Sequence, residues 1–406
     1  MNYDGGLTVD LGKKLMEPKI GHVDGVEIAF FLQNLDGGGA ERAIANLAVE
    51  IAKLEYAVHL VLGDANTVYS SEVTRDVMVI DFTTRSPLMT FVRLMMYLHQ
   101  KKPSVIMSAL DTPNLMLLMA AMLVRFKGRV VISQRAVILA SLSHEPLLRA
   151  LLTKFLQRLL FARADNLISN SYAAADEVKS LFGVPDEKVT VVHNAINLDR
   201  IHRLASEPLI NDFYIKSRVP LILSVGSLTM RKDVSTLIKA LAIVRTRRPV
   251  RLALIGDELA QADGSEKERL LQLTVNLGLF DNVLFAGFDP NPYKWMSAAA
   301  VFVSSSTAEG FPNVIAEALA VGCPVVATDC PGDTAKLLED GRWGRLVPVG
   351  DPESMATAIL EALDDPSPSD GLMRAANFSP SKIVREYLQV LIPQSICDNN
   401  SRVSDS

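Results

Sequence analysis

The sequence has few cysteines and no histidine pattern that would hold a metal ion. Its three cysteines, Cys323, Cys330 and Cys397, form neither an even disulfide framework nor the paired spacing of a zinc site. None of the six histidines has ligand spacing, and the Gly-x-Ser-x-Gly motif of α/β-hydrolases is missing. We therefore expect a protein of a reducing compartment without a metal centre.

Long apolar runs, a secretion signal and an excess of positive charge are missing as well. The apolar stretch 115–124 is too short to span a membrane and is followed by three basic residues. Residues 1–24 lack the basic start and apolar core of a signal peptide, so we expect them to form a loose leader. A net charge of -5 argues against general binding of nucleic acid. These absences predict a chain that is made and kept in the cytosol.

What is present is a long chain with a globular composition. Its 406 residues exceed the size of one ordinary core, which makes two domains the default expectation. A content of 49% hydrophobic and 21% charged residues fits an enzyme with large buried sheets.

Short apolar runs alternate with helical patterns twice along the chain. The first series of predicted strands comprises 26–35, 57–64, 77–82, 104–110, 129–134, 166–171 and 189–196. A polar segment at about 197–219 interrupts the pattern, and the second series comprises 221–228, 250–257, 282–288, 300–306 and 324–329. Such alternation predicts two α/β domains, each a doubly wound parallel sheet with helices on both faces.

We place the two domains at residues 25–200 and 201–378. Ligands of such sheets bind beyond the carboxyl ends of the strands, so a cleft between the domains is the expected site. A helical pattern follows at 379–392, and residues 393–406 form a polar tail that we expect to be disordered.

Two glutamates, Glu309 and Glu317, flank a Gly-Phe-Pro-Asn turn in the stretch STAEGFPNVIAEALA. Pro312 predicts a helix start, which leaves Glu309 in the loop and Glu317 inside the helix. Free N–H groups near Asn313 and Val314 would form an anion site at the positive end of the helix dipole. The carboxylates could then accept hydrogen bonds from hydroxyls of a sugar or a ribose. Spacing alone, however, favours one loop acid and one solvated helix acid.

Arg231 and Lys232 stand at the mouth of a βα unit, in the stretch SVGSLTMRKDVSTLI. There they are well placed for phosphate oxygens, although a solvated pair in a surface loop fits the pattern equally well. Gly38 and Gly39 belong to the stretch LDGGGAER, between a predicted strand and helix, and glycines permit close approach by a ligand. The pattern alone does not separate that role from a tight turn.

Residues 147–163 form a predicted amphipathic helix in which Arg149, Lys154 and Arg158 lie among leucines. Basic amphipathic helices lie on anionic membrane surfaces, whereas packing on the domain core is the simpler explanation for any one helix. The many leucines, with the apolar stretch 113–124 in the same domain, support the membrane interpretation.

Taken in order, these segments resemble the retaining family 4 glycosyltransferases, which have the GT-B fold of two facing Rossmann-like domains. The resemblance runs from LQNLDGGGAERAIANLA through VGSLTMRKDVSTLIKAL to GFDPNPYKWMSAAAVFVSSSTAEGFPNVIAEALAVGCPVVATDCPGD. The E-x7-E pair of Glu309 and Glu317 is its most specific part.

The resemblance implies a role for each motif. Glu317 would bind the nucleotide ribose, and Glu309 would lie beside the transferred sugar or its leaving phosphate. Arg231 and Lys232 match the cationic clamp on the diphosphate, whose negative charge grows as the glycosidic bond breaks. The remaining sugar and diphosphate contacts implied by the family are Gly310, Phe311, Pro312, Asn313, Val314, Gly38 and Gly39.

Arg135 and Asn170, at the ends of two predicted strands, are candidates for the acceptor side. Arg135 stands in the region where many members have a histidine, as in a branch that acts on amino sugars and on lipid-linked or polysaccharide acceptors. The chain departs from the family at Ser227, where many members have arginine. It also departs at Lys336, where a glutamate is usual, with Asp333 or Thr334 as its expected partial replacement.

The resemblance thus implies a retaining glycosyltransferase that needs no metal or other cofactor and no protein nucleophile. It would move a hexose or N-acetylhexosamine from a nucleotide diphosphate sugar, UDP-linked, to a lipid-linked, lipopolysaccharide or polysaccharide glycan. We expect it in the cytoplasm, at the inner face of the membrane, with helix 379–392 crossing back to the first domain. A sugar-nucleotide epimerase or phosphorylase on this fold, or a catalytically degenerate scaffold subunit, stays as the alternative.

Overall fold

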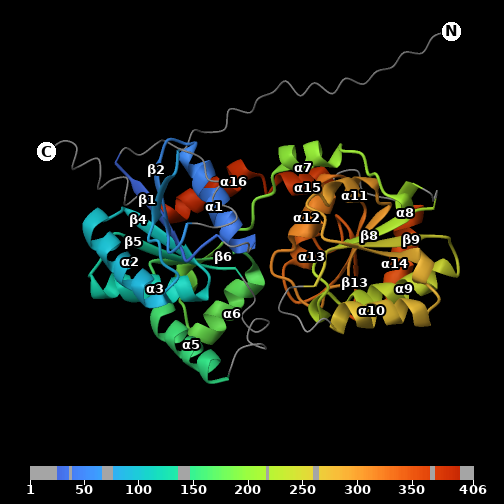
Figure 1. The fold of residues 1–406 in the computed structure, drawn as a ribbon, viewed down its shortest axis with the longest axis horizontal. Coiled ribbons are helices and arrows are strands. Elements are labelled where there is room, and N and C mark those ends of the chain that lie inside the picture. The colour runs from blue at the N-terminus through green and yellow to red at the C-terminus, as the bar shows by residue number, and fades with distance from the viewer. Residues whose placement is uncertain are drawn as a thin grey trace, which may run out of the picture.

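The computed structural model describes residues 25–35, 39–65, 76–135, 147–215, 219–258, 265–365 and 371–393. The leader 1–24, Gly38 and the tail from 394 onward, on which we made predictions, lie outside these residues. Two α/β domains lie side by side along the long axis of the molecule (Figure 1).

The first domain is built on seven parallel strands in the order β3-β2-β1-β4-β5-β6-β7. Residues of β1 alternate between two cores: Ile28 and Phe30 face one, Ala29 and Phe31 the other. Strands buried on both faces need apolar side chains throughout, which explains the continuous apolar runs. The strands are β1 (Glu27–Leu32), β2 (Ala57–Leu62), β3 (Met78–Asp81), β4 (Val105–Ala109), β5 (Arg129–Gln134), β6 (Asn166–Ser169) and β7 (Val189–Val191).

Helices cover both faces of this sheet (Figure 1). One core lies beneath α1 (Gly39–Ala52) and α16 (Pro380–Leu391). The other lies beneath α2 (Pro87–Lys101), α3 (Asp111–Leu123), α5 (Leu147–Leu160) and α6 (Tyr172–Phe182). The last helix that the structure describes, α16, therefore packs on the first domain, where the side chains of Tyr387 and Leu391 are buried.

The second domain has six parallel strands in the order β10-β9-β8-β11-β12-β13. They are β8 (Leu221–Val225), β9 (Arg251–Ile255), β10 (Val283–Gly287), β11 (Val301–Ser304), β12 (Val325–Thr328) and β13 (Arg345–Val347). One face is covered by α9 (Val234–Arg245), α10 (Ser265–Asn276) and α14 (Pro352–Asp364). The other is covered by α7 (Leu198–Ala205), α8 (Asp212–Ile215), α11 (Tyr293–Ala298), α12 (Asn313–Ala320), α13 (Thr334–Leu337) and α15 (Gly371–Ala376).

The two parallel-sheet domains agree with the predicted fold class, and three local features differ from expectation. The polar segment 197–219 contains α7, whose one fully buried residue, Ile201, packs in the second domain. β13 was not predicted, because only three residues with a partly exposed arginine form it. The apolar stretch 113–124 belongs to α3, which begins earlier, at Asp111, and ends at Leu123, since Arg125 takes a left-handed conformation with φ 50°.

The chain crosses between the domains twice, and the two crossings are joined. Ile196 N donates a hydrogen bond of 2.7 Å to Phe378 O. Past this point α16 is fixed to the first domain by Arg129 Nε, which donates to Val390 O at 3.0 Å.

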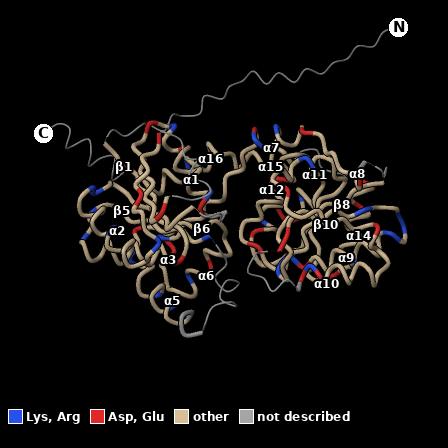
Figure 2. Tube along the Cα trace, in the orientation of Figure 1, with Lys and Arg blue, Asp and Glu red and all other residues tan. Residues whose placement is uncertain are grey.

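Basic and acidic residues occur in both domains (Figure 2). In the described part of the chain, none of the helices has the length and apolar character needed to cross a membrane.

Candidate functional site

A cluster of two cations and one carboxylate lies where β8 and β11 end. Lys232 Nζ is 2.5 Å from Glu309 Oε1, and Arg231 Nη1 is 3.1 Å from Glu309 Oε2. Ser306 Oγ donates to Glu309 Oε1 at 2.6 Å, and Arg231 Nη1 also donates to Ala308 O at 2.7 Å. The two loops are therefore held together by charge-assisted hydrogen bonds, the stronger kind in proteins.

Glu309 is buried, with 7% of its surface exposed. Burial alone would raise the pKa of Glu309, but Lys232 and Arg231, with the Ser306 hydroxyl, together hold that pKa below its ordinary value. Glu309 is thus ionised at neutral pH. The side chain of Arg231 is 41% exposed and that of Lys232 is 17% exposed, so Arg231 keeps the greater access to solvent.

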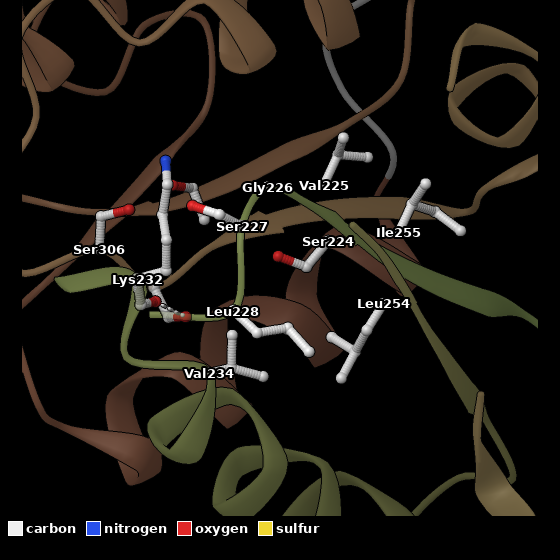
Figure 3. A pocket seen from close by; sticks show the side chains of 12 residues that line it. Ser224, Val225, Gly226, Ser227, Leu228, Lys232, Val234, Leu254, Ile255 and Ser306 are labelled. Atoms are coloured by element: carbon white, nitrogen blue, oxygen red, sulfur yellow. Dashed lines mark hydrogen bonds between the residues drawn. The ribbon is translucent and has the colours of Figure 1, made fainter. Parts of the chain in front are cut away.

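Gly226 makes room for Lys232 at the end of β8. Its φ is 154°, and a Cβ there would lie 3.3 Å from Lys232 Cε. In Figure 3 the Lys232 side chain extends between Ser227 and Ser306. Ser227, the departure from the family pattern, lines this pocket with a hydroxyl, so Lys232 is the cation among the residues that line it.

The turn between Glu309 and α12 is held rigidly. Pro312 directly precedes α12, as the sequence predicts. Phe311 is buried, and its ring stacks on His193 of the first domain with centroids 4.8 Å apart. Gly310 approaches the β6–α6 loop closely, because a Cβ on it would lie 3.9 Å from Asn170 Oδ1. This turn, residues 310–312, is called the donor-side turn below, because the family resemblance implies that it contacts the donor. The donor-side turn and the first domain therefore meet directly.

Glu317 lies on α12 and faces a cavity between the domains. Its carboxylate accepts a hydrogen bond of 3.2 Å from Tyr293 OH. Burial raises the pKa of Glu317 to about 7, against the lowering influence of Tyr293 and Arg200. The cavity has a volume of about 390 Å³, and side chains from α1, α7, α11, α12 and α16 line it. Glu317 is thus neither a solvated helix acid nor a partner of Glu309.

The acceptor-side candidates adjoin the start of α12. Arg135 donates to Asn194 Oδ1 at 3.1 Å and to Tyr387 OH at 2.7 Å. Asn194 Nδ2 in turn donates to Asn313 Oδ1 at 3.0 Å. Asn170 is buried and donates to Arg135 O at 3.2 Å. Arg135 and Asn170 are therefore brought together with the donor-side turn.

The glycine loop is less fully defined. Gly39 is the first residue of α1, whereas Gly38 lies outside the described residues. Farther along α1, Arg42 and Asn46 line the cavity that also contains Glu317. The start of α1 thus reaches the interdomain cavity.

Several site residues were missed by the sequence reasoning. Ser306 and Tyr293 bond the two glutamates, and His193 stacks on the turn; only Ser306, three residues before Glu309, left a local signal. Asp333 does not fill the expected donor contact, because its carboxylate accepts the backbone N–H of Tyr172 at 2.9 Å. Lys336 lies over the ring of the same tyrosine, 3.8 Å from its centroid.

In the part of the chain that the structure describes, no three His, Cys, Asp or Glu side chains are grouped so that they could hold a metal ion.

Both halves of the chain match known protein families. Residues 37–200 match the family described as Glycosyltransferase Family 4, and residues 219–365 match the family described as Glycosyl transferases group 1.

Two curated proteins are similar in sequence. One is the N-acetylgalactosamine-N,N'-diacetylbacillosaminyl-diphospho-undecaprenol 4-alpha-N-acetylgalactosaminyltransferase of Campylobacter jejuni, 31% identical over 379 residues, which cover 90% of this chain and 99% of that protein. The other is the lipopolysaccharide core biosynthesis glycosyltransferase LpsE of Rhizobium meliloti, 32% identical over 238 residues, which cover 57% of this chain and 65% of that protein.

Two solved structures share the fold. The Anabaena protein HepE, in complex with UDP, matches with a TM-score of 0.72 and 21% identity, over 90% of this chain and 99% of that chain. The lipopolysaccharide outer core galactosyltransferase WaaB matches with a TM-score of 0.70 and 16% identity, over 91% of this chain and 100% of that chain.

The raised pKa of Glu317 predicts how pH affects stability. With an ordinary value of 4.5 and a folded value of about 7, the native state holds the extra proton between these pH values. Its contribution is therefore complete below pH 4.5 and is lost as pH rises through 7. Glu317→Gln should raise Tm relative to the wild type at pH 8 and leave Tm little changed at pH 5. Thermal unfolding of both proteins across this range tests it, and a difference that does not depend on pH would contradict it.

The buried ion pair predicts a non-additive loss of stability. Lys232→Met leaves Glu309 buried with only the more exposed Arg231 as its cation, and we expect a loss of about 3 kcal/mol. Lys232→Met with Glu309→Gln should be more stable than Lys232→Met alone, because the unpaired buried charge is removed. Urea unfolding of the two single variants and the double variant measures this. Additive losses would show that the pair is not coupled.

Proposed function

Because the chain belongs to the group 1 and family 4 glycosyltransferases, we propose that it is a retaining enzyme that moves a hexose or N-acetylhexosamine from a UDP-sugar to a lipid-linked glycan. One observation carries the donor side of this proposal. Arg231, Lys232 and Glu309 cluster where two parallel strands end, next to the start of α12 and against the first domain.

The cluster suits a leaving diphosphate. As the glycosidic bond breaks, negative charge grows on the diphosphate, so cations placed there stabilise the transition state more than the ground state. Arg231 is half-exposed and able to form two parallel bonds to phosphate oxygens, while Lys232 supplies a point charge. We propose that these two cations and the start of α12 carry the diphosphate without a metal ion.

The state of Glu309 fits transfer with retention. Its lowered pKa keeps it ionised, so it has no proton to give to the leaving group. Both of its carboxylate oxygens accept bonds from cations, which makes it a poor nucleophile. We propose that the acceptor hydroxyl attacks the anomeric carbon on the face from which the diphosphate leaves. The hydroxyl proton then passes to the departing phosphate, and Glu309 accepts a hydrogen bond from the sugar.

Glu317 would bind the ribose hydroxyls. Its carboxylate faces the interdomain cavity, and Tyr293 OH holds it in place. Asn313 at the start of α12 lines the same cavity, between the proposed ribose and diphosphate positions.

Two buried polar atoms without a hydrogen-bond partner support the proposed acceptor site. Among the described residues, Asn170 Oδ1 and Arg135 Nε are buried and have no hydrogen-bond partner. Buried polar groups are rarely left so, and a glycan hydroxyl could bond both. The Campylobacter relative is named for an undecaprenol diphosphate acceptor, which supports a lipid-linked glycan for this chain.

Helix α5 supports contact with a membrane. Leu151, Leu152, Phe155 and Leu159 are 56%, 58%, 64% and 52% exposed. At 3.6 residues per turn they share an arc of about 100°. The opposite face is anchored by Gln157 Nε2, which donates to Asp111 Oδ1 at 2.8 Å. An exposed apolar stripe on a helix that also carries basic residues fits an anionic membrane surface.

The donor site predicts a loss of transfer in two variants. With lipid-linked glycan extract as acceptor, the wild type should release UDP from at least one of UDP-glucose, UDP-galactose, UDP-GlcNAc and UDP-GalNAc. Lys232→Ala and Glu317→Ala should lower kcat/KM about 100-fold, since each removes a donor contact. Lys239→Ala, an exposed lysine on neighbouring α9, is the control and should be unaffected. Unchanged donor affinity in both variants would refute the site, and an epimerised sugar would point to the alternative reaction.

The exposed stripe predicts binding to vesicles. Phe155→Glu should abolish co-sedimentation with vesicles rich in phosphatidylglycerol, because it places a charge in the apolar stripe. Met373→Glu is the matched control: Met373 is 67% exposed but lies in the second domain. Binding by the wild type should weaken when phosphatidylglycerol is replaced by phosphatidylcholine. Equal binding of Phe155→Glu and the wild type would rule out α5 as the contact.

A further inference from the structure

Asp333 joins the two domains through a buried carboxylate. Only 1% of its surface is exposed. It belongs to the second domain, directly before α13, yet its side chain accepts hydrogen bonds from backbone groups of the first domain. Tyr172 N donates to its two oxygens at 3.0 and 2.9 Å, and Ala173 N donates at 3.4 Å.

These donors are the first N–H groups of α6. The first four N–H groups of a helix have no partner within it, and a carboxylate there also meets the positive end of the helix dipole. Within α6, Ser171 Oγ accepts the N–H of Ala174 at 3.2 Å. The N–H groups of Tyr172 and Ala173 have no acceptor within α6, and the carboxylate of Asp333 accepts their hydrogen bonds from the other domain. The cap of α6 is therefore complete only when the domains are together.

The loop that carries Asp333 is fixed to the turn that carries Glu309. Glu309 N donates to Pro331 O at 3.0 Å, and Asp333 N donates to Gly310 O at 3.2 Å. Between them Gly332 has a φ of 136°, and a Cβ there would lie 1.9 Å from Glu309 O. The two backbones are thus in contact with no room for a side chain. A displacement of Asp333 must move the Glu309 turn with it.

The other end of the same turn also contacts the first domain. Phe311 packs between His193 and Phe378, with ring centroids 4.8 and 5.0 Å away. Asn313 Oδ1 accepts a hydrogen bond from Asn194. Among these contacts, Asp333 is the charged and most deeply buried one, so its loss should cost the most.

We propose that Asp333 is a positioning residue, which couples closure of the two domains to the placement of Glu309 by capping α6 across the interface. Asp333 touches neither reacting atom in this scheme and acts through the Glu309 turn. Its effect on turnover rests on the proposed function, whereas its effect on closure does not.

Closure can be measured with UDP as the probe and without turnover. Spin labels on Ser180→Cys of α6 and Thr357→Cys of α14, both exposed, report the distance between the domains. Cys397→Ser removes the cysteine of the tail, while Cys323 and Cys330 are buried. In Asp333→Ala with saturating UDP, the ratio of the closed population to the open population in the distance distribution should fall about tenfold, because charge-assisted bonds are lost. Asp340→Asn, at an exposed acid near the same interface, should match the labelled parent.

A second pair of variants removes only the donor N–H. Proline is favoured at the first position of a helix, and Ser171 has the extended conformation that a following proline requires. Tyr172→Pro therefore keeps α6 and deletes the nearer of the two N–H groups that Asp333 accepts, while Tyr172→Ala deletes the ring alone. We expect Tyr172→Pro to open the domains relative to Tyr172→Ala. Adding Asp333→Ala to Tyr172→Pro should open them little further, since only the longer bond from Ala173 N, at 3.4 Å, is left to lose.

The outcomes separate the two proposals. A lower closed fraction in Asp333→Ala and Tyr172→Pro than in the parent and in Tyr172→Ala supports the coupling, and UDP affinity by calorimetry should then weaken to the extent that UDP favours the closed state. Where transfer is measurable, kcat should fall about tenfold with little change in donor KM. Closed fractions equal to those of the parent and of Tyr172→Ala would overturn the coupling, whatever the enzyme transfers. Absence of transfer by the wild type would count against the proposed function and leave the closure result standing.

Discussion

The buried carboxylate of Glu309 is the constraint on which the site depends. A charge with so little access to water is stable only beside opposite charge, and Lys232 and Arg231 provide it from the neighbouring loop. This requirement fixes the loops after β8 and β11 against each other and places two cations at the carboxyl edge of the sheet. The same cations suit a diphosphate, so the electrostatic demand that organises the loops would also prepare the proposed donor site.

The donor-side turn is also the place where the two domains meet. Its backbone is fixed to the loop that carries Asp333, its Phe311 ring stacks on His193, and Asn313 bonds Asn194. Glu309 therefore sits on a segment held by both domains, although every residue that neutralises its charge comes from the second domain. In the proposed function donor and acceptor bind to different domains, and such a segment would then respond when both halves of the site come together.

Much of the fold followed from local pattern. Continuous apolar runs located the strands of both sheets, with β13 as the exception, because three residues ending beside solvent give no periodic signal. Pro312 marked the start of α12 correctly. The contacts between residues around the site were harder to predict from the sequence. Tyr293 lies on a different helix from Glu317, and Asp333 bonds a helix about 160 residues earlier, so neither contact leaves a trace at short spacing.

The sequence by itself determined the two α/β domains and the family, because these depend on apolar periodicity and on motifs of contiguous residues. The spacing of Glu309 and Glu317 favoured one loop acid and one solvated helix acid, whereas the family resemblance implied a donor contact for each. Only the tertiary structure decided that point: Glu309 is ionised beside two cations, whereas Glu317 is half-buried beside Tyr293 with its pKa raised to about 7. The reason is that the charge state of a carboxylate depends on burial and on partners brought by distant segments, and these exist only once the chain has folded.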